Sequence, residues 1–421
     1  MRFQQLADWL AWQEHAHPKP IDLGHERMRR VAGRLGLLAT ESWVLTVAGT
    51  NGKGSSVAYA AALLRAAGWS VGAYTSPHVL EYRERIRING ACVDESDIVR
   101  AFDAIDRARG GTSLTYFEFA TLAARWLFRE AEVGAQVLEV GLGGRLDAVN
   151  TFDPDVALVT SVGVDHCEWL GPDRESVGRE KAGIFRRGRP AVFAGPELPD
   201  SVATQARGLG ASLHVAGEDF GWQPAAGDCW IYRDGIGSVG PLSRPPLTGN
   251  VQVDNAAGVL CALRSVPGLV LSESLWSRAM VDFRLCGRLQ ALPGAPVWWL
   301  DVAHNPDSAR VLADALGARP CAGRRFACIG LMARKDLPAV LEPLRGLFHG
   351  WYLMALPGDD MWPPERMREA LMGEVIMAQG PPETLFPGIR DELGPEDELV
   401  AFGSFRTVEE ALRFRAVDSL E

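Results

Sequence analysis

The sequence predicts an α/β protein in which a doubly wound, mostly parallel sheet carries a P-loop-like turn and is followed by a smaller, Rossmann-like α/β domain. Two observations predict this class. Short apolar runs bounded by turns alternate with segments of helical period, which is typical of parallel strands covered by helices on both faces. The chain has 421 residues, 47% of them hydrophobic, and this length exceeds the size at which a single core stops growing. We therefore expect two domains.

The predicted first domain begins with an apolar strand and ends near residue 287. Its expected elements are strands at 43–49, 70–76, 135–144 and 156–163, with helices at 55–67, 95–108 and 116–131. A stretch rich in Gly, Pro, Trp and Asp, at about 217–247, breaks this rhythm and is interpreted as a loop or a small β excursion. The pattern resumes with a helix at about 251–266.

The alternation restarts after the turn at Pro293-Gly294, which we interpret as the join between the domains. Strands are expected beyond it near 297–302, 326–331, 350–355 and 398–402. We therefore predict an N-terminal domain of residues 1–287 and a smaller C-terminal domain of residues 288–421.

Composition excludes several classes of partner. A formal net charge of -10 at pH 7 argues against a general nucleic-acid or anionic-membrane binder, because such partners attract a basic field. The chain contains no stretch of roughly 18 unbroken apolar residues, and MRFQQLADWLAWQEH lacks the regions of a secretory leader. The seven scattered cysteines form no CxxC pair and are expected to be reduced thiols. We expect a cytoplasmic protein.

Positive charge is nevertheless concentrated in one segment, YRERIRI. Its period-2 pattern predicts a strand with Arg83, Arg85 and Arg87 on one face and Glu84 and Ile86 on the other. This face is either an ordinary solvated surface or a local site for an anionic small substrate.

The segment VLTVAGTNGKGSS has the order of a strand, a glycine turn and a helix, in which backbone N–H groups can hold phosphate. Gly49 and Gly52 permit the tight turn, and Lys53 offers a positive charge to phosphate oxygens. The helix expected from Ser55 adds free N–H groups and the positive end of its dipole. An ordinary strand-to-helix turn is the alternative. Because Gly54 replaces the metal-binding hydroxyl of a standard GxxxxGK[ST] loop, the metal ligands must come from elsewhere.

Polar residues at the ends of three other predicted strands are candidates for those ligands. Glu139 interrupts an apolar strand near its C-terminal end, Asp165-His166 follows another, and Ser76 ends a third. Each has an ordinary explanation: a salt bridge from Glu139 to Arg145, a structural histidine and a Ser-Pro turn. Together, the hydroxyl, carboxylate and imidazole would form a Mg²⁺ shell completed by water and phosphate oxygens.

The C-terminal domain contains a further polar cluster, in WWLDVAHNPDS. An apolar strand there ends in Asp301, His304 and Asn305. The cluster is interpreted as facing a cleft between the domains, while a helix N-cap at Asn305-Pro306 or Asp307 is the compatible structural alternative.

These motifs together resemble the Mur ligase superfamily of ATP-dependent amide-bond-forming ligases, and specifically its folate branch, the dihydrofolate synthase/folylpolyglutamate synthases. The resemblance covers nearly the whole chain, in the order IDLGHERM, GTNGKGS, TSPHVLEYRERIRING, TYFEFATLAA, LEVGLGGRLDAVN, VDH, REKAGIFR, GRLQ, DVAHNP and GSFRTVEEA. A glycine after the loop lysine is usual in this family, as at Gly54. The resemblance implies an enzyme of folate biosynthesis that adds L-glutamate to dihydropteroate and to reduced folates through an acyl phosphate.

The resemblance also implies a metal site and a modified lysine. Mg²⁺ would be held by Ser76, Glu139 and His166, and Lys181 would carry a carboxyl group as a carbamate. A carbamate replaces a cation with two oxygens that suit a hard metal. An ordinary lysine paired with Glu180 is the alternative.

The family's ligand-binding residues map onto this chain in four groups. ATP is expected at Thr50, Asn51, Gly52, Lys53, Gly54, Ser55, Asn255, Arg288 and Asp301. The pteroate or folate is expected at Ile21, Asp22, Leu23, Gly24, Thr115, Tyr116, Phe117, Glu118, Leu146, Asp147, Ala148 and Asn150. L-glutamate is expected at His304 and Ser404, and catalytic roles are expected for Lys53, Lys181 and His304. The chain departs from the family before Asn255, where GNVQVDNAAG lacks the usual histidine.

The implied partners are small molecules: ATP, dihydropteroate or a reduced folate, and L-glutamate. We expect no nucleic-acid or membrane partner, and we expect a monomer. One alternative is another Mur-type amino-acid ligase acting on a different carboxylate. A second alternative is a nucleotide-binding regulator without ligase activity, in which Glu139 and His166 would be structural.

Overall fold

The computed structural model describes residues 1–418 and divides into two compact units. Unit 1 comprises Met1–Pro245 and Gln252–Phe283, and unit 2 comprises Pro246–Val251 and Arg284–Glu421. The units change at Phe283, close to the predicted boundary after residue 287. Within residues 1–418, every helix is too short or too polar to span a bilayer. The seven cysteines are free thiols.

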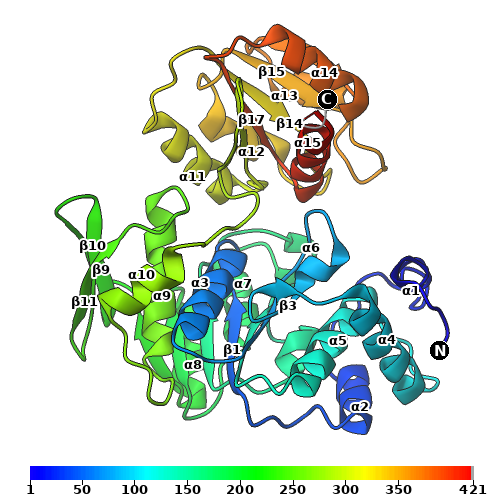
Figure 1. The fold of residues 1–421 in the computed structure, drawn as a ribbon, viewed down its shortest axis with the longest axis vertical. Coiled ribbons are helices and arrows are strands. Elements are labelled where there is room, and N and C mark those ends of the chain that lie inside the picture. Colours follow the sequence, from blue (N-terminus) through cyan, green and yellow to red (C-terminus); the bar gives the residue numbers. More distant parts are fainter. Residues whose placement is uncertain (419–421) are drawn as a thin grey trace. The chain divides into compact units, whose positions relative to one another are not determined.

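Unit 1 is built on one large sheet that is flanked by helices (Figure 1). The strand order of the sheet is β4-β3-β2-β5-β1-β6-β7-β8. Its strands are β1 (Trp43–Ala48), β2 (Val71–Tyr74), β3 (Ile86–Ile88), β4 (Ala91–Cys92), β5 (Ala135–Glu139), β6 (Val156–Val159), β7 (Pro190–Phe193) and β8 (Ser212–Val215). All neighbours from β2 to β8 pair in parallel, whereas β3 and β4 extend one edge in antiparallel fashion. The predicted mostly parallel sheet is confirmed.

Helices cover the sheet because its strands are apolar on both faces. The helices of this part are α1 (Leu6–Gln13), α2 (Glu26–Arg34), α3 (Lys53–Ala66), α4 (Glu95–Arg109), α5 (Tyr116–Glu130), α6 (Cys167–Leu170), α7 (Arg174–Ala182), α8 (Asp200–Leu209), α9 (Asn250–Leu263) and α10 (Glu273–Met280), with short 3-10 turns η1 (Tyr82–Arg85) and η2 (Ala148–Thr151). Strand residues Val44, Tyr74 and Leu138 pack in one core with Phe102 of α4 and Phe119 of α5. Helix α3 instead packs on β1, β2 and β5, and helix α10 packs against α3.

The predicted β excursion is an antiparallel sheet of order β11-β10-β9, built from β9 (Phe220–Ala225), β10 (Cys229–Asp234) and β11 (Ser238–Ser243). Helix α9 then returns to the main sheet. A Cβ at Gly258 would lie 2.6 Å from the Cβ of Ala194, so this glycine permits close packing of the helix. The predicted helix at about 251–266 is therefore present as α9.

The predicted strand across YRERIRI is wrong in its first half. Residues Tyr82–Arg85 form the 3-10 turn η1, and only Ile86–Ile88 form a strand. The reason lies in the carboxylate of Glu84, which accepts hydrogen bonds of 2.8 to 2.9 Å from the backbone N–H groups of residues 79–81. These bonds stabilise a capped turn in place of an extended chain.

The turn also separates the arginines that were expected to share a face. Arg85 is only 8% exposed, and its Nε donates to Nδ1 of His78 at 2.9 Å. Its guanidinium lies 5.3 Å and 5.5 Å from the ring centroids of Tyr82 and Tyr116, within the range of cation–π attraction. Arg83 pairs with exposed Glu81 in solvent. The segment therefore provides one buried cation and no basic strand face.

Unit 2 is a smaller α/β layer with the strand order β12-β13-β17-β14-β15-β16. Its strands are β12 (Gln290–Leu292), β13 (Val297–Leu300), β14 (Arg325–Ile329), β15 (Gly350–Met354), β16 (Ile376–Gly380) and β17 (Glu398–Phe402). Its helices are α11 (Pro306–Gly317), α12 (Leu337–Leu341), η3 (Glu342–Leu344), α13 (Pro364–Ala370), α14 (Pro382–Glu392) and α15 (Phe405–Asp418). All pairs except β12 with β13 are parallel. The Pro293-Gly294 turn lies in the β12–β13 hairpin of this unit, so its interpretation as the join between the domains is wrong.

Asp397 links the neighbouring strands β14 and β17 at the point where both begin. Its carboxylate accepts from the backbone N–H of Arg324 at 2.7 Å, from Arg324 Nη2 at 2.8 Å and from the N–H of Gly394 at 2.9 Å. The hydrogen bonds from Arg324 lower the pKa of Asp397 to about 2. Since this pKa lies below the usual 3.8, the stabilisation is present above pH 3.8 and is lost as the pH falls towards 2.

We expect Asp397→Asn to destabilise unit 2 by about 2 kcal/mol, because charge-assisted hydrogen bonds are lost. Scanning calorimetry at pH 7 should show a lower melting temperature for the affected transition. The difference from the unchanged protein should shrink between pH 4 and pH 2. As a control, Asp360→Asn removes an exposed ion pair with Arg406 in the same unit and should change little. Equal effects of both substitutions would contradict this account.

Candidate active site

The glycine turn after β1 is shaped by Gly52, and helix α3 begins at Lys53, earlier than the predicted Ser55. Gly52 adopts a left-handed conformation with φ 86° at the helix N-cap, where a side chain would be strained. A Cβ at this position would also lie 2.4 Å from Oδ1 of Asn255. Among residues 1–418, no side chain caps α3, so its first N–H groups can bind an anion. This geometry suits phosphate binding, and Asn255 lies beside the turn.

Hydrogen bonds tie this turn to the segment after β6. The Thr50 hydroxyl donates to the carbonyl of Gly163 at 3.0 Å, and the Thr160 hydroxyl donates to the carbonyl of Asn51 at 2.6 Å. Lys53 Nζ donates to two carbonyl oxygens of the turn at 2.9 and 3.1 Å, which holds its positive charge over the loop. The segments that follow β1 and β6 are therefore held together by hydrogen bonds, although they are distant in sequence.

Ser55 lies just beyond Gly54, within the first turn of α3. It is buried, and its hydroxyl has no hydrogen-bond partner among the described residues. A buried polar group without a partner is costly, so this hydroxyl is suited to a polar ligand at the loop.

Two of the predicted metal ligands meet at neighbouring strand ends. Glu139, at the end of β5, is only 4% exposed, and its Oε2 accepts a 3.2 Å hydrogen bond from the backbone N–H of Ser76. The alternative salt bridge from Glu139 to Arg145 is wrong, because Arg145 pairs with Glu180 at 2.8 Å. Because Glu180 pairs with Arg145, the alternative prediction of an ion pair between Glu180 and Lys181 is also wrong.

Lys181, in the last turn of α7, is buried. Burial, with the nearby positive charge of Lys53, lowers its pKa to about 7, against the opposing attraction of Asp165 and Asp147. Lys181 therefore lies in the electrostatic field of the phosphate-binding turn. Its ammonium group therefore loses a proton more readily than that of an exposed lysine.

His166 follows Asp165 after β6 and has an unusual backbone conformation. Its φ of 53° is left-handed, and its N–H donates to Oδ1 of Asp165 at 2.9 Å. A strained conformation in a non-glycine residue often marks a functional position. No group of three or more His, Cys, Asp or Glu side chains within residues 1–418 could hold a metal ion, and the predicted shell contains just two of these types, Glu139 and His166. Hydroxyl and carboxylate donors beside a phosphate turn fit a hard cation such as Mg²⁺.

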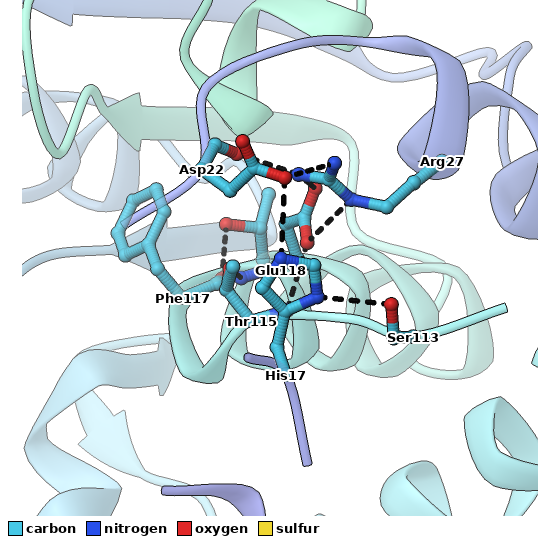
Figure 2. Close-up of polar contacts among 8 residues, drawn as sticks. His17, Asp22, Arg27, Ser113, Thr115, Phe117 and Glu118 are labelled. Carbon is cyan, nitrogen blue, oxygen red and sulfur yellow. Dashed lines mark hydrogen bonds and ion pairs between the residues drawn. The ribbon is translucent and has the colours of Figure 1, made fainter. Parts of the chain in front are cut away.

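The predicted pteroate residues come from three segments, and hydrogen bonds join these segments. Gly24 donates its backbone N–H to the carbonyl of Leu146 at 3.0 Å. Thr115 caps α5 in a reciprocal capping box with Glu118, with hydrogen bonds of 2.8 and 3.2 Å. Figure 2 shows Asp22 and Glu118 next to the Arg27 guanidinium, which bonds to both.

Two more of these residues are fixed by backbone contacts. Asp147 is buried and accepts from the N–H groups of Leu142 and Val149, each at 2.9 Å. Burial raises the pKa of Asp147 to about 7 in spite of these bonds. The side-chain amide of Asn150 donates to the carbonyls of Arg145 and Gly183 at 3.1 and 3.0 Å. Asn150 therefore connects the turn after β5 to the end of α7.

Two residues of this region, His17 and Arg27, were not predicted from the sequence. His17 bonds to Asp22 and Ser113, and Arg27 bonds to Asp22 and Glu118. The only signal in the sequence was that Arg27 belongs to the segment IDLGHERM. Its acidic partners are 5 and 91 positions away, so no local pattern could identify them.

In unit 2, Asp301 follows β13 and lies beside the predicted nucleotide residue Arg288. Its carboxylate accepts from the backbone N–H groups of Leu289 and Ala303, each at 2.7 Å. Burial raises the pKa of Asp301, and the positive charge of Arg288 opposes this shift.

The two predicted glutamate-binding residues are also in unit 2. Nδ1–H of His304 donates to the carbonyl of Val302 at 2.7 Å, which fixes the orientation of the ring. Ser404 accepts from the N–H of Thr407 at 3.1 Å and lies just before α15. Asn305 caps α11 in a capping box with Ser308, which confirms the N-cap interpretation. The roles in glutamate binding stay predictions.

In a comparison with known proteins, both units match domain models of the Mur ligases. The Mur ligase middle domain model matches residues 47–196, and the Mur ligase glutamate ligase domain model matches residues 287–405. The dihydrofolate synthase/folylpolyglutamate synthase of Escherichia coli (strain K12) is 42% identical over 403 residues, covering 96% of this chain and 94% of that protein. The chain belongs to the dihydrofolate synthase/folylpolyglutamate synthase family.

Solved structures of relatives agree with this membership. E. coli FolC in complex with DHPP and ADP superposes with a TM-score of 0.93 at 40% identity, covering 99% of this chain and 98% of that one. A bifunctional folylpolyglutamate synthase/dihydrofolate synthase with Mn, AMPPNP and L-glutamate bound has a TM-score of 0.90 at 38% identity, with 98% of each chain covered.

We expect Gly52→Ala to destabilise unit 1 by about 1 to 2 kcal/mol through its left-handed backbone, and to displace Asn255. Calorimetric titration with a non-hydrolysable ATP analogue should show affinity reduced by about tenfold or more.

Gly68→Ala is the matched control at the other end of α3. Gly68 has a φ of 91° but open space around its Cβ position, so its substitution adds strain without a clash. It should lower stability and leave nucleotide affinity unchanged. Equal nucleotide affinity in the two variants would refute the role of Gly52.

Proposed function

We propose that this protein is an ATP-dependent ligase that adds L-glutamate to dihydropteroate, giving dihydrofolate, and to reduced folates, giving folylpolyglutamates. The observation that carries the proposal is the 42% identity to a bifunctional enzyme of this name over 96% of the chain. The ADP, AMPPNP and L-glutamate bound in relatives' structures support the choice of co-substrates. The grouping of the loop, Ser76 and Glu139 at one sheet edge supports the same chemistry.

The reaction needs an activated carboxylate, because a carboxylate and an amine do not condense at neutral pH. The pteroate or folate carboxylate attacks the γ-phosphorus of ATP, giving an acyl phosphate and ADP. The amine of glutamate then attacks the acyl carbon, and phosphate leaves with the C–O bond electrons. Both reactants of the first step are anions, so positive charge and alignment must provide most of the catalysis.

Specific residues are proposed to supply these effects. Lys53 and the N–H groups of the turn would stabilise the phosphates, with Asn255 beside them. Ser76, Glu139 and His166 would hold Mg²⁺, which would screen the charge of the transferring phosphoryl group. In unit 2, Arg288 and Asp301 would complete the nucleotide contacts, while His304 and Ser404 would bind glutamate.

The pteroate or folate is proposed to bind the three segments that the structure joins, 21–24, 115–118 and 146–148, with Asn150 beside them. The ring of Phe117 would offer a flat apolar face to the pterin. The four partly buried positions 21–24 and the fixed carboxylate of Asp147 supply polar contacts beside it.

Lys181 is proposed to carry the carbamate. Burial lowers the pKa of Lys181 to about 7, and only an uncharged amine attacks carbon dioxide to form an N–C bond and lose a proton. The product would replace a buried cation beside Lys53 with an anion, which favours the modification electrostatically.

We also propose that residues 1–287 bind ATP and the pteroate and that residues 288–421 form the glutamate-ligase domain, in line with the two matched domain models. A monomeric state and a cytoplasmic location remain predictions.

The central test is Lys53→Ala. Loss of the loop cation should reduce ADP release in the presence of dihydropteroate and glutamate by about a hundredfold or more. Arg65→Ala, at the exposed end of the same helix, should retain full activity. Near-normal turnover of Lys53→Ala would refute the assignment.

The assay also separates the alternatives when the acceptor is varied on the unchanged protein. Glutamate-dependent ADP release with dihydropteroate and with a reduced folate, tested separately, is the expected result. ADP release only with a different carboxylate would indicate another Mur-type ligase. ATP binding without glutamate-dependent turnover would indicate a regulator.

Carboxylation of Lys181 has its own spectroscopic test. Protein equilibrated with ¹³C-bicarbonate should show a carbamate carbon signal that is absent from Lys181→Arg, and this variant should lose ligase activity. Lys19→Arg, an exposed lysine, should keep both. An identical carbon spectrum for Lys181→Arg and the unchanged protein would exclude the modification.

A further inference from the structure

Arg27, in the first turn of α2, connects two segments that are distant in sequence (Figure 2). Its Nη1 donates to Asp22 Oδ2 at 2.5 Å, and its Nη2 donates to the carbonyl of Asp22 at 2.6 Å and to Glu118 Oε1 at 3.1 Å. One guanidinium therefore fixes both the side chain and the backbone of Asp22 while it holds the first turn of α5.

His17 supports the same carboxylate from a second direction. One ring nitrogen lies 3.2 Å from Asp22 Oδ2, and the other lies 3.0 Å from the hydroxyl of Ser113. The His17 side chain is only 7% exposed, so the ring is held in place. His17 thereby joins Asp22 to the chain that leads into α5.

The charges in this cluster make Arg27 indispensable to its geometry. Two carboxylates, on Asp22 and Glu118, share the single guanidinium, and the Glu118 side chain is only 4% exposed. Without Arg27, a buried carboxylate would lose its cation and would face a second carboxylate, which favours separation of the two segments. Segment 21–24 would then move away from α5.

The cluster also retains an acceptor for a ligand. Within residues 1–418, Asp22 Oδ1 accepts no hydrogen bond, because Arg27 and His17 both bond to Oδ2. The Asp22 side chain is 28% exposed, so Oδ1 can reach a bound molecule. The attraction of Arg27 and the hydrogen bond with His17 lower the pKa of Asp22 against the effect of burial.

We infer that Arg27, assisted by His17, is a positioning residue for the pteroate or folate: it locks segment 21–24 to the start of α5 and directs Asp22 Oδ1 to an N–H donor of this substrate. The inference rests on the proposed function. Neither Arg27 nor His17 touches ATP or glutamate in this scheme, so the effect should be confined to one substrate.

Arginine suits this task and lysine does not. The observed contacts need several donors in one plane, from Nη1 and Nη2, spread over two carboxylates and a carbonyl. A lysine ammonium would keep the charge but could not span these acceptors in the same geometry. Arg27→Lys should therefore lie between the unchanged protein and Arg27→Met.

The experiment measures KM separately for dihydropteroate and for ATP. Arg27→Met should raise KM for dihydropteroate by about tenfold to a hundredfold, the range for losing charged hydrogen bonds, with KM for ATP within about twofold. Arg27→Lys should show a smaller increase, and His17→Ala an increase of several fold. A 2-desamino analogue of dihydropteroate, which lacks the amino group and both of its N–H donors, should be affected less by Arg27→Met than dihydropteroate is.

Arg30→Ala is the matched control, because Arg30 lies one turn further along α2 and, among the residues that the structure describes, forms an ion pair only with exposed Glu26. It should leave both KM values unchanged. If Arg27→Met proves unfolded by circular dichroism, Arg27→Lys and His17→Ala decide the question.

Three outcomes would overturn the inference: unchanged KM for dihydropteroate in every Arg27 and His17 variant, an equal rise in KM for ATP, or equal effects on dihydropteroate and its 2-desamino analogue. Activity of the unchanged protein keeps the outcomes distinct. If it releases no ADP with dihydropteroate and glutamate, the proposed function fails. If the unchanged protein releases ADP and the variants have the same KM for dihydropteroate as the unchanged protein, only the positioning role is refuted.

Discussion

The parallel pairing of β2, β5, β1 and β6 is the constraint on which the candidate site depends. The register sets Tyr74 opposite Leu138, Glu139 opposite Val47, and Ala48 opposite Val159. The four following turns therefore leave the sheet at one edge, which is where ligands bind in open α/β folds. A shift of one residue in this register would turn Glu139 to the other face.

Burial determines the chemistry at that edge. Glu139, Asp147 and Lys181 are all buried, and burial moves the pKa of Asp147 up and that of Lys181 down, each to about 7. A single buried charge is unfavourable, but acids and cations gathered around one turn offset each other, and charges act more strongly where water is excluded. The same low dielectric that makes these groups costly to bury strengthens their attraction for a phosphate or a metal.

The proposed pteroate region depends on a different kind of contact. Its segments have no common strand or helix, and they are joined by side chains that reach across the sequence. Arg27 bonds to Asp22, which precedes its own helix, and to Glu118 on α5, while the N–H of Gly24 donates to the carbonyl of Leu146. Such a region is sensitive to single substitutions because few contacts define its geometry.

The sequence alone determined the fold class, the glycine turn before α3 and the family, because the spacing of apolar residues, the positions of glycines and short motifs are local properties of the chain. Predictions from the sequence failed where contacts between residues distant in sequence determine the local structure or the ion pairs. Tyr82–Arg85 form a turn because Glu84 binds three backbone N–H groups, and the alternating pattern did not reveal this. Likewise, only the tertiary structure decided that Arg145 pairs with Glu180 and that Arg27 joins Asp22 to Glu118. The physical reason is that an ion pair depends on distance in space, and the fold sets that distance.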